Sequence, residues 1–198
     1  MKILLFGGFL GSGKTTVINQ IMRSMVAEGN QLAVIENEIG AISIDDKLIG
    51  QTDVAVTPLF GGCVCCQITG DLLTALQRIE SDIHPDWIIV EMTGLALMRD
   101  IREKLLSYGK LDARITTVSV VDASRWEILM RAMPKLIADQ IDGADLVLAN
   151  KSDIKPLTDQ AFREISEFSH DAPCISISTV ECRDLWKIIQ EVLPDACL

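Results

Sequence analysis

A phosphate-binding pattern lies close to the amino end of the sequence. Residues 8–15, GFLGSGKT, fit G-x-x-x-x-G-K-[ST] between an apolar strand-like segment and a helix-like one. Glycines let such a loop wrap a phosphate, with backbone N–H groups and the helix N-terminus directed at the anion. We expect Lys14 to reach the β- and γ-phosphates and Thr15 to give its hydroxyl to Mg²⁺. The expected phosphate-binding set is Gly8, Gly11, Ser12, Gly13, Lys14, Thr15 and Thr16.

A second pattern, late in the chain, indicates which base the nucleotide carries. LVLANKSD (146–153) places Asn150, Lys151 and Asp153 after an apolar strand, in the N-K-x-D order of GTP-binding proteins. The Asp153 carboxylate can accept hydrogen bonds from the ring N–H and the exocyclic amine of guanine, whereas adenine offers no matching pair of donors. The expected ligand is therefore GTP or GDP. A P-loop kinase for small molecules is disfavoured, because no acceptor-binding motif is evident.

Acidic residues between these two motifs are candidates for the magnesium site and for loops that respond to the nucleotide. Glu91 ends the apolar segment of WIIVEMTGLA (87–96), where it could orient Mg²⁺, and Gly94 could sense the γ-phosphate. We assign Lys14 and Glu91 as catalytic residues. The residue that positions the attacking water is not evident from the sequence: Glu38, Asp45, Glu91 and a group from another molecule all qualify. The switch candidates are Glu36, Glu38, Asp45 and Gly94.

Three cysteines, Cys63, Cys65 and Cys66, fall within four positions of FGGCVCCQITGDL (60–72). Their thiolates could converge on one soft or borderline cation, each losing its proton on binding. Tetrahedral Zn²⁺ would need a fourth ligand, and an incomplete set suits a carrier that must release its metal. The segment lies between the two regions expected to respond to nucleotide, so GTP and metal affinities should be reciprocally coupled. Buried small residues and a redox or thiol-transfer site are the competing interpretations.

Composition limits the class of protein. Eighteen Lys and Arg against 28 Asp and Glu give a net charge of −10, which argues against nucleic acid or an anionic membrane as the main partner. No apolar stretch reaches the roughly 20 residues of a membrane helix. We therefore expect a cytoplasmic protein with reduced thiols. For Cys174, Cys182 and Cys197, which are scattered, packing or incidental exposure is the favoured interpretation.

Strand-like and helix-like segments alternate along the whole chain. Continuous Ile, Val and Leu runs predict strands buried on both faces, as in a parallel sheet covered by helices. A length of 198 residues suits one domain with one substantial core. The expected strands are 2–8, 31–37, 53–60, 86–92, 113–122, 144–150 and 172–178, and the clearest expected helices are 14–29, 68–82 and 181–193.

The ordered set of motifs resembles a known family. GGFLGSGKTT, ENEIG, GGCVCCQITGDLL, EMTGLA, SVVDAS and QIDGADLVLANKSD look like the GTPase domain of the CobW/P47K family, relatives of the UreG and HypB nickel chaperones. The resemblance implies an α/β P-loop NTPase of the SIMIBI type, with a mostly parallel central sheet flanked by helices on both faces. It also implies a metal-responsive GTPase that passes zinc, cobalt or nickel to a client metalloprotein through the cysteine motif, and often a homodimer that closes around nucleotide.

Two departures restrict what the resemblance implies. Ala41 follows Gly40 where the family usually has a further glutamate. The family's typical second, C-terminal domain is not expected, so residues 1–198 are taken as a single GTPase domain, and His84 and His170 form no histidine-rich tract. Two other functions stay open: a GTPase chaperone that assists a corrinoid or other metalloenzyme without carrying free metal, and a thiolate module that buffers metal without turnover.

Overall fold

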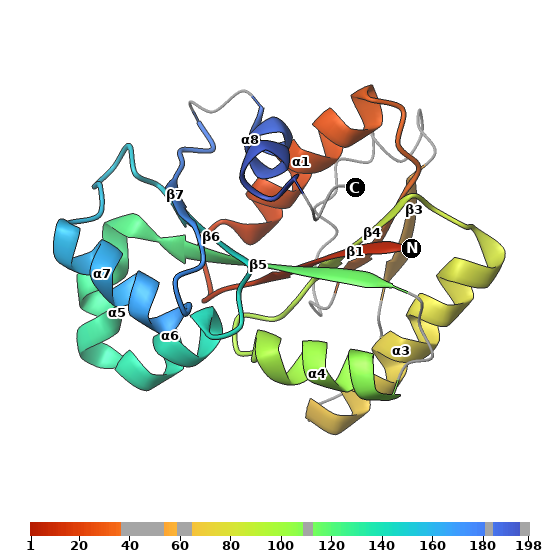
Figure 1. Cartoon of the computed structure of the whole chain (residues 1–198), viewed down its shortest axis with the longest axis horizontal. Coiled ribbons are helices and arrows are strands. Elements are labelled where there is room, and N and C mark those ends of the chain that lie inside the picture. The colour runs from red at the N-terminus through yellow and green to blue at the C-terminus, as the bar shows by residue number, and fades with distance from the viewer. Residues whose placement is uncertain (37–53, 59–64, 109–112, 181–183, 195–198) are drawn as a thin grey trace.

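A seven-stranded parallel sheet forms the centre of the computed structural model, which describes residues 1–36, 54–58, 65–108, 113–180 and 184–194 (Figure 1). Of residues 54–58, 65–69 and 71 the backbone alone is described. The strand order is β3-β2-β4-β1-β5-β6-β7, and every described pair is parallel. The strands are β1 Lys2–Gly7, β2 Leu32–Glu36, β3 Val54–Pro58, β4 Trp87–Glu91, β5 Arg114–Asp122, β6 Leu146–Asn150 and β7 Cys174–Ser176.

Helices cover both faces of this sheet, as Figure 1 shows. One face carries α1 (Lys14–Ala27) and α8 (Leu185–Val192). The other carries α3 (Cys65–Asp82) and α4 (Met98–Tyr108) over its β4 side, and α5 (Trp126–Ala132), α6 (Pro134–Ile141) and α7 (Asp159–Phe168) over its β6 side. The sequence-based prediction of a P-loop α/β fold with a mostly parallel sheet is confirmed.

Side-chain alternation in the strands explains why two cores form. In β1, Leu4 and Phe6 pack with α1 and α8, whereas Ile3 and Leu5 pack with α3 and α4. Because successive strand residues point to opposite faces, an apolar run is buried on both faces of the sheet. The sequence-derived strands are confirmed within a few residues. The largest difference is at β7, which is shorter than predicted and which, among the described strands, pairs with β6 alone.

Two helix starts differ from the sequence-based prediction. Helix α3 begins at Cys65 rather than near Ile68, so two cysteines of the motif occupy its first positions. Helix α8 begins at Leu185, after Asp184 caps it by accepting a hydrogen bond from the Lys187 backbone N–H at 3.1 Å. In the described part of the chain, no helix combines the length and apolar character needed to cross a membrane.

Candidate functional site

The loop between β1 and α1 has the backbone shape that its glycines allow. Gly8, Gly11 and Gly13 have φ values of 128°, 74° and 94°, in the region that other residues avoid. A Cβ at Gly8 would overlap the carbonyl of Val120, and one at Gly13 would overlap the side chain of Asn150. Gly13 is also the N-cap of α1 and brings no capping side chain, while the first turn holds no acidic residue. The helix N-terminus therefore suits an anion.

Two buried polar side chains line the same loop. The ammonium of Lys14, whose residue is 5% exposed, lies 3.0 Å from the carbonyl oxygen of Gly8 and 3.5 Å from that of Phe9. The Ser12 hydroxyl is buried and has no hydrogen-bond partner among the described residues. A buried cation and an unpaired buried hydroxyl fit a loop that accepts phosphate oxygens.

Thr15 and Glu91 meet at the start of α1. The Thr15 hydroxyl donates to Glu91 Oε1 at 2.8 Å, and the Glu91 side chain is buried. Glu91 ends β4 in register with Glu36 at the end of β2, so a second acidic residue stands on the neighbouring strand. Hydroxyl and carboxylate oxygens are ligands that Mg²⁺ prefers, and the pair therefore fits a magnesium ion.

The segment after β4 packs directly on the phosphate-binding loop. A Cβ at Gly94 would lie 2.7 Å from the Leu10 side chain and 2.8 Å from its backbone nitrogen, so only glycine fits there. The buried Gln140 side chain on α6 donates to the Gly94 carbonyl, and its own backbone carbonyl accepts from the Ser119 hydroxyl at 3.1 Å. A displacement of Gly94 would therefore shift residues that it contacts in both the loop and α6.

The loop after β6 lies against the same phosphate-binding loop. The Asn150 side chain, 1% exposed as a residue, donates to the Ser12 carbonyl at 2.9 Å and accepts from the Thr179 backbone N–H at 3.4 Å. Lys151, held at a φ of 63°, donates to the Gly11 carbonyl at 2.7 Å. Asp153 is exposed in the turn that follows. Asn150 and Lys151 thus join the predicted base-recognition loop to the predicted phosphate loop.

Sequence reasoning assigned no role to Asp122, Arg125 or Gln140. Asp122 ends β5, and its carboxylate accepts from Lys151, Arg125 and the Ser124 hydroxyl at 2.7, 2.7 and 2.6 Å. Burial raises the pKa of Asp122, but the hydrogen bonds from Lys151, Ser124 and Arg125 outweigh it and lower that pKa below its ordinary value. The available signal was an acidic residue at the carboxyl end of an apolar strand, the same signal that marked Glu91.

Several predicted residues lie outside the described part of the chain. Glu38, Asp45 and Cys63 fall in 37–53 and 59–64, and of Cys65 and Cys66 the backbone alone is placed, at the start of α3. Among the described residues, no group of three or more His, Cys, Asp and Glu is arranged to hold a metal ion. The cysteine metal site therefore stays a prediction.

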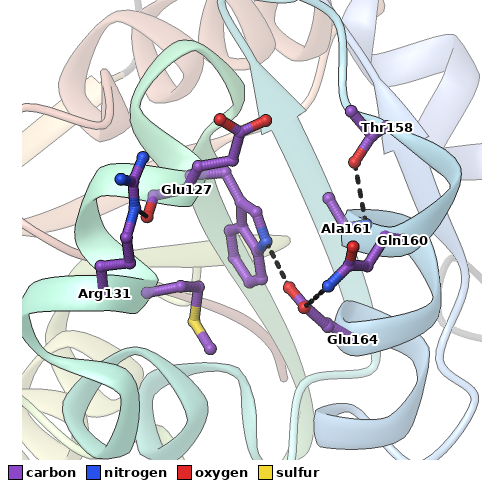
Figure 2. Close-up of a pocket in the computed structure, with 8 residues that line it drawn as sticks. Glu127, Arg131, Thr158, Gln160, Ala161 and Glu164 are labelled. Carbon is purple, nitrogen blue, oxygen red and sulfur yellow. Dashed lines mark hydrogen bonds between the residues drawn. The ribbon is translucent and has the colours of Figure 1, made fainter.

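A pocket of about 580 Å³ between α5 and α7 lies apart from these groups (Figure 2). Its described lining includes no residue of the phosphate-binding loop. The Trp126 indole N–H and the Gln160 amide both donate to the Glu164 carboxylate, at 2.9 and 3.0 Å, and Thr158 caps α7 by accepting from the Ala161 N–H at 3.2 Å. No lining residue is among the described residues whose buried side-chain oxygen or nitrogen lacks a hydrogen-bond partner.

Comparison with known proteins finds one matching family model. The model describes the nucleotide-binding domain of CobW/HypB/UreG and matches residues 2–176. Among curated proteins, the zinc chaperone YjiA of Escherichia coli is 29% identical over 186 residues, covering 90% of this chain and 58% of its own. The zinc-regulated GTPase metalloprotein activator 1 of Dictyostelium discoideum is 30% identical over 196 residues, covering 78% of this chain and 40% of its own.

Solved structures agree on the fold. The hydrogenase maturation factor HypB from Archaeoglobus fulgidus superposes with a TM-score of 0.70 at 13% identity, covering all of this chain and 91% of its own. The chain spans only about 58% and 40% of the two curated relatives' lengths. The rest of each relative lies outside the matched region.

Proposed function

The chain belongs to the family of CobW/HypB/UreG nucleotide-binding domains, and we propose that it is a GTPase that couples its nucleotide state to the binding and delivery of a transition metal. The family match and the names of the curated relatives support membership of a metal-related P-loop GTPase family.

The single observation that carries the nucleotide part is the Thr15 to Glu91 hydrogen bond of 2.8 Å beside the buried Lys14. Residues 76 positions apart meet where the phosphate-binding loop enters α1. Thr15 and Glu91 would hold Mg²⁺, which when bound supplies positive charge beside the phosphates. Their oxygen donors are the reason for this assignment, because Mg²⁺ prefers such ligands.

The hydrolytic role of the chain's own residues follows from charge. As water attacks the γ-phosphorus, the bond to the β–γ bridging oxygen breaks. Negative charge grows on this oxygen, which leaves as part of GDP. The Lys14 ammonium and the backbone N–H groups at the start of α1 can stabilise that charge without reorganising. Gly94, packed on Leu10, is the proposed sensor of the γ-phosphate. Glu36, in register with Glu91, joins Glu38 and Asp45 as a candidate switch residue.

Guanine selection is proposed for the loop after β6. Asn150 and Lys151 are held on the Ser12 and Gly11 carbonyls, and the exposed Asp153, two positions after Lys151, would accept the guanine N–H donors. GTP and GDP are therefore the proposed ligands.

The metal part of the proposal rests on the place where the cysteine segment leaves the sheet. Strand β3 ends at Pro58, in register with Glu36, and Glu36 is in register with Glu91. Strand β3 therefore ends at the same sheet edge as Glu91, and in the sequence Cys63 follows Pro58 by five positions. Cys65 and Cys66 open α3, and helix N-termini favour negatively charged groups such as thiolates.

The cargo and the partners are proposed by chemistry and by likeness to the relatives. Thiolates suit Zn²⁺, with Co²⁺ or Ni²⁺ as alternatives, and the two curated relatives are named for zinc. The recipient would be a client metalloprotein, and a homodimer that forms in response to nucleotide or metal is part of the proposal. A reducing compartment, the cytoplasm, would keep the ligand thiols available.

One titration tests the metal proposal. The anaerobic, reduced protein is titrated with Zn²⁺ and Co²⁺ against a competing chelator in three states: free of nucleotide, with Mg-GDP, and with Mg and a non-hydrolysable GTP analogue. Thiolate-to-cobalt absorption reports cysteine ligation. Cys65→Ser tests the motif, and Cys174→Ser, in β7, is the matched control.

The proposal expects metal affinity to differ by about tenfold or more between nucleotide states, a difference that Cys65→Ser abolishes and Cys174→Ser preserves. Equal affinity in all three states would overturn the cargo role. If the three cysteines also tolerate serine in client activation, a chaperone that assists a metalloenzyme without carrying free metal becomes the better conclusion. Metal binding without any GTP turnover would instead indicate a buffering module.

A further inference from the structure

Asp122 is a buried carboxylate at the carboxyl end of β5. Its side chain is 1% exposed. Both a guanidinium and an ammonium donate to its Oδ2, Arg125 through Nε and Lys151 through Nζ, each at 2.7 Å, while Ser124 donates to Oδ1 at 2.6 Å. A buried charge with this number of charged and polar partners is fully satisfied.

The same two cations also donate hydrogen bonds to the predicted phosphate-binding loop. Lys151 Nζ lies 2.7 Å from the Gly11 carbonyl oxygen, and Arg125 Nη2 lies 3.0 Å from the Leu10 carbonyl oxygen. The carbonyls of Leu10 and Gly11, two successive residues of the loop, thus accept hydrogen bonds from two cations that both donate to the Asp122 carboxylate. The three side chains come from the end of β5, from the short 3-10 helix Ala123–Arg125 and from the loop after β6.

We propose that Asp122 is a positioning residue for nucleotide binding, because its carboxylate orients Arg125 and Lys151 against the carbonyls of Leu10 and Gly11 and so braces the phosphate-binding loop. The inference rests on the proposed function only in that the braced loop binds the phosphates of a guanine nucleotide. It goes further by assigning to Asp122 and Arg125, which lie outside the nucleotide-binding motifs, the task of coupling that loop to the base-recognition loop.

Two physical effects of removing the Asp122 charge have opposite signs. By charge alone, losing an anion beside a site for a polyphosphate should strengthen nucleotide binding. By positioning, the change should weaken it, since Lys151 and Arg125 lose the acceptor that fixes their geometry. The sign of the change in affinity therefore separates the brace from a general field effect.

The test compares Asp122→Asn with the control Asp145→Asn. Asp145 also accepts hydrogen bonds from an arginine and a threonine, from Arg102 at 2.9 Å and from the Thr117 N–H and hydroxyl at 2.8 Å each. It directly precedes β6, at the amino edge of the sheet, whereas the phosphate-binding loop leaves the carboxyl edge. The control therefore removes a carboxylate that also accepts from an arginine and a threonine, although its side chain is 32% exposed, without touching the brace.

Two readouts are measured on the full chain. The first is the Kd for Mg-GDP together with KM and kcat for GTP. The second is hydrogen exchange in peptides covering residues 8–16 of the nucleotide-free protein, which reports the order of the loop without any ligand. For Asp122→Asn we expect Kd and KM to rise about tenfold or more with a smaller change in kcat, and exchange in 8–16 to accelerate.

For Asp145→Asn we expect nucleotide affinity and exchange in 8–16 within about twofold of the wild type. Unchanged or tighter nucleotide binding by Asp122→Asn, with unchanged exchange, would overturn the brace. If the wild type binds no guanine nucleotide, the proposed function fails, while hydrogen exchange still decides the brace. Should Asp122→Asn not fold, Arg125→Ala removes one arm of the brace from a side chain that is 41% exposed, and the same two readouts apply.

Discussion

Replacing Asn150 with alanine should lower both the free energy of unfolding and the affinity for nucleotide. The Asn150 amide donates to the Ser12 carbonyl at 2.9 Å in a buried position, and Ser12 accepts from no other described residue. The Asn150 oxygen also accepts from the Thr179 N–H at 3.4 Å. Asn150→Ala therefore removes one buried link that joins three loops: the predicted phosphate-binding loop, the loop after β6 and the loop after β7.

The size of the effect follows from what stays unpaired. Loss of one neutral hydrogen bond costs about 1 kcal/mol, and leaving the buried Ser12 carbonyl without a donor adds about 1–2 kcal/mol. We expect the free energy of unfolding to fall by roughly 2–3 kcal/mol. Nucleotide affinity should fall by about tenfold, equivalent to about 1.4 kcal/mol, because the loop must be ordered again on binding.

A matched control exists within the same chain. Asn30 donates its amide to the Met25 carbonyl, also at 2.9 Å, but the Asn30 backbone N–H donates to the same carbonyl at 3.1 Å. Asn30→Ala thus leaves that carbonyl satisfied and should cost only about 1 kcal/mol or less.

Both variants can be followed by denaturant unfolding, with fluorescence from the buried Trp87, Trp126 and Trp186, and by GDP titration. If Asn150→Ala loses no more stability than Asn30→Ala and binds GDP normally, the assignment of Asn150 as a link between the loops is refuted.

Four further outcomes are expected. Lys14→Ala should abolish GTP hydrolysis while the circular dichroism spectrum stays native, and normal turnover by the folded variant would contradict the assigned role. Asp153→Asn should reduce the preference for GTP over other purine nucleotides in competition binding, whereas unchanged selectivity would mean that guanine binds elsewhere. Burial raises the pKa of Cys174 to about 12, so alkylation at pH 8 should be far slower in the native than in the urea-unfolded protein, as mass spectrometry of its peptide would show; equal rates would contradict this burial. The pKa of Asp122 is lowered in the folded protein, so its carboxylate stabilises the fold above its unfolded-state pKa, and this stabilisation is lost as pH falls through the folded-state pKa. The difference in unfolding free energy between wild type and Asp122→Asn, measured by denaturant melts, should therefore narrow below about pH 4. A difference independent of pH would show that the carboxylate charge is not what stabilises the site.

The place of the phosphate site in the fold follows from strand order. Strand β1 lies between β4 and β5, so the loop after β1 has the end of β4 on one side and the end of β5 on the other. In an open parallel sheet, ligands bind at the carboxyl ends of the strands. Glu91 and Asp122 end those two neighbouring strands. Glu91 accepts from Thr15 at the end of the loop, and Asp122 accepts from Arg125, which donates to the Leu10 carbonyl of the loop.

Local chemistry made much of the architecture predictable from the sequence alone. The conformation of the loop after β1 could be predicted because glycines permit positive φ values, which Gly8, Gly11 and Gly13 adopt, while its phosphate-binding role stays a prediction. Strands and helices could be placed because apolar runs and helical periodicity are properties of neighbouring residues. The family resemblance rested on the same contiguous motifs, and the match over residues 2–176 confirms it.

Only the tertiary structure decided which distant residues meet. The contacts of Thr15 with Glu91, of Asp122 with Lys151 and of Gln140 with Gly94 join residues 76, 29 and 46 positions apart. They depend on the order of strands in the sheet, which apolar runs do not specify, because any two such strands can pair through the same backbone groups. The start of α3 at Cys65, rather than near Ile68, was likewise not predicted by the local sequence pattern. The sequence thus determined the parts and their chemistry, and packing of the sheet determined that Asp122 is connected through Arg125 and Lys151 to the predicted phosphate-binding loop.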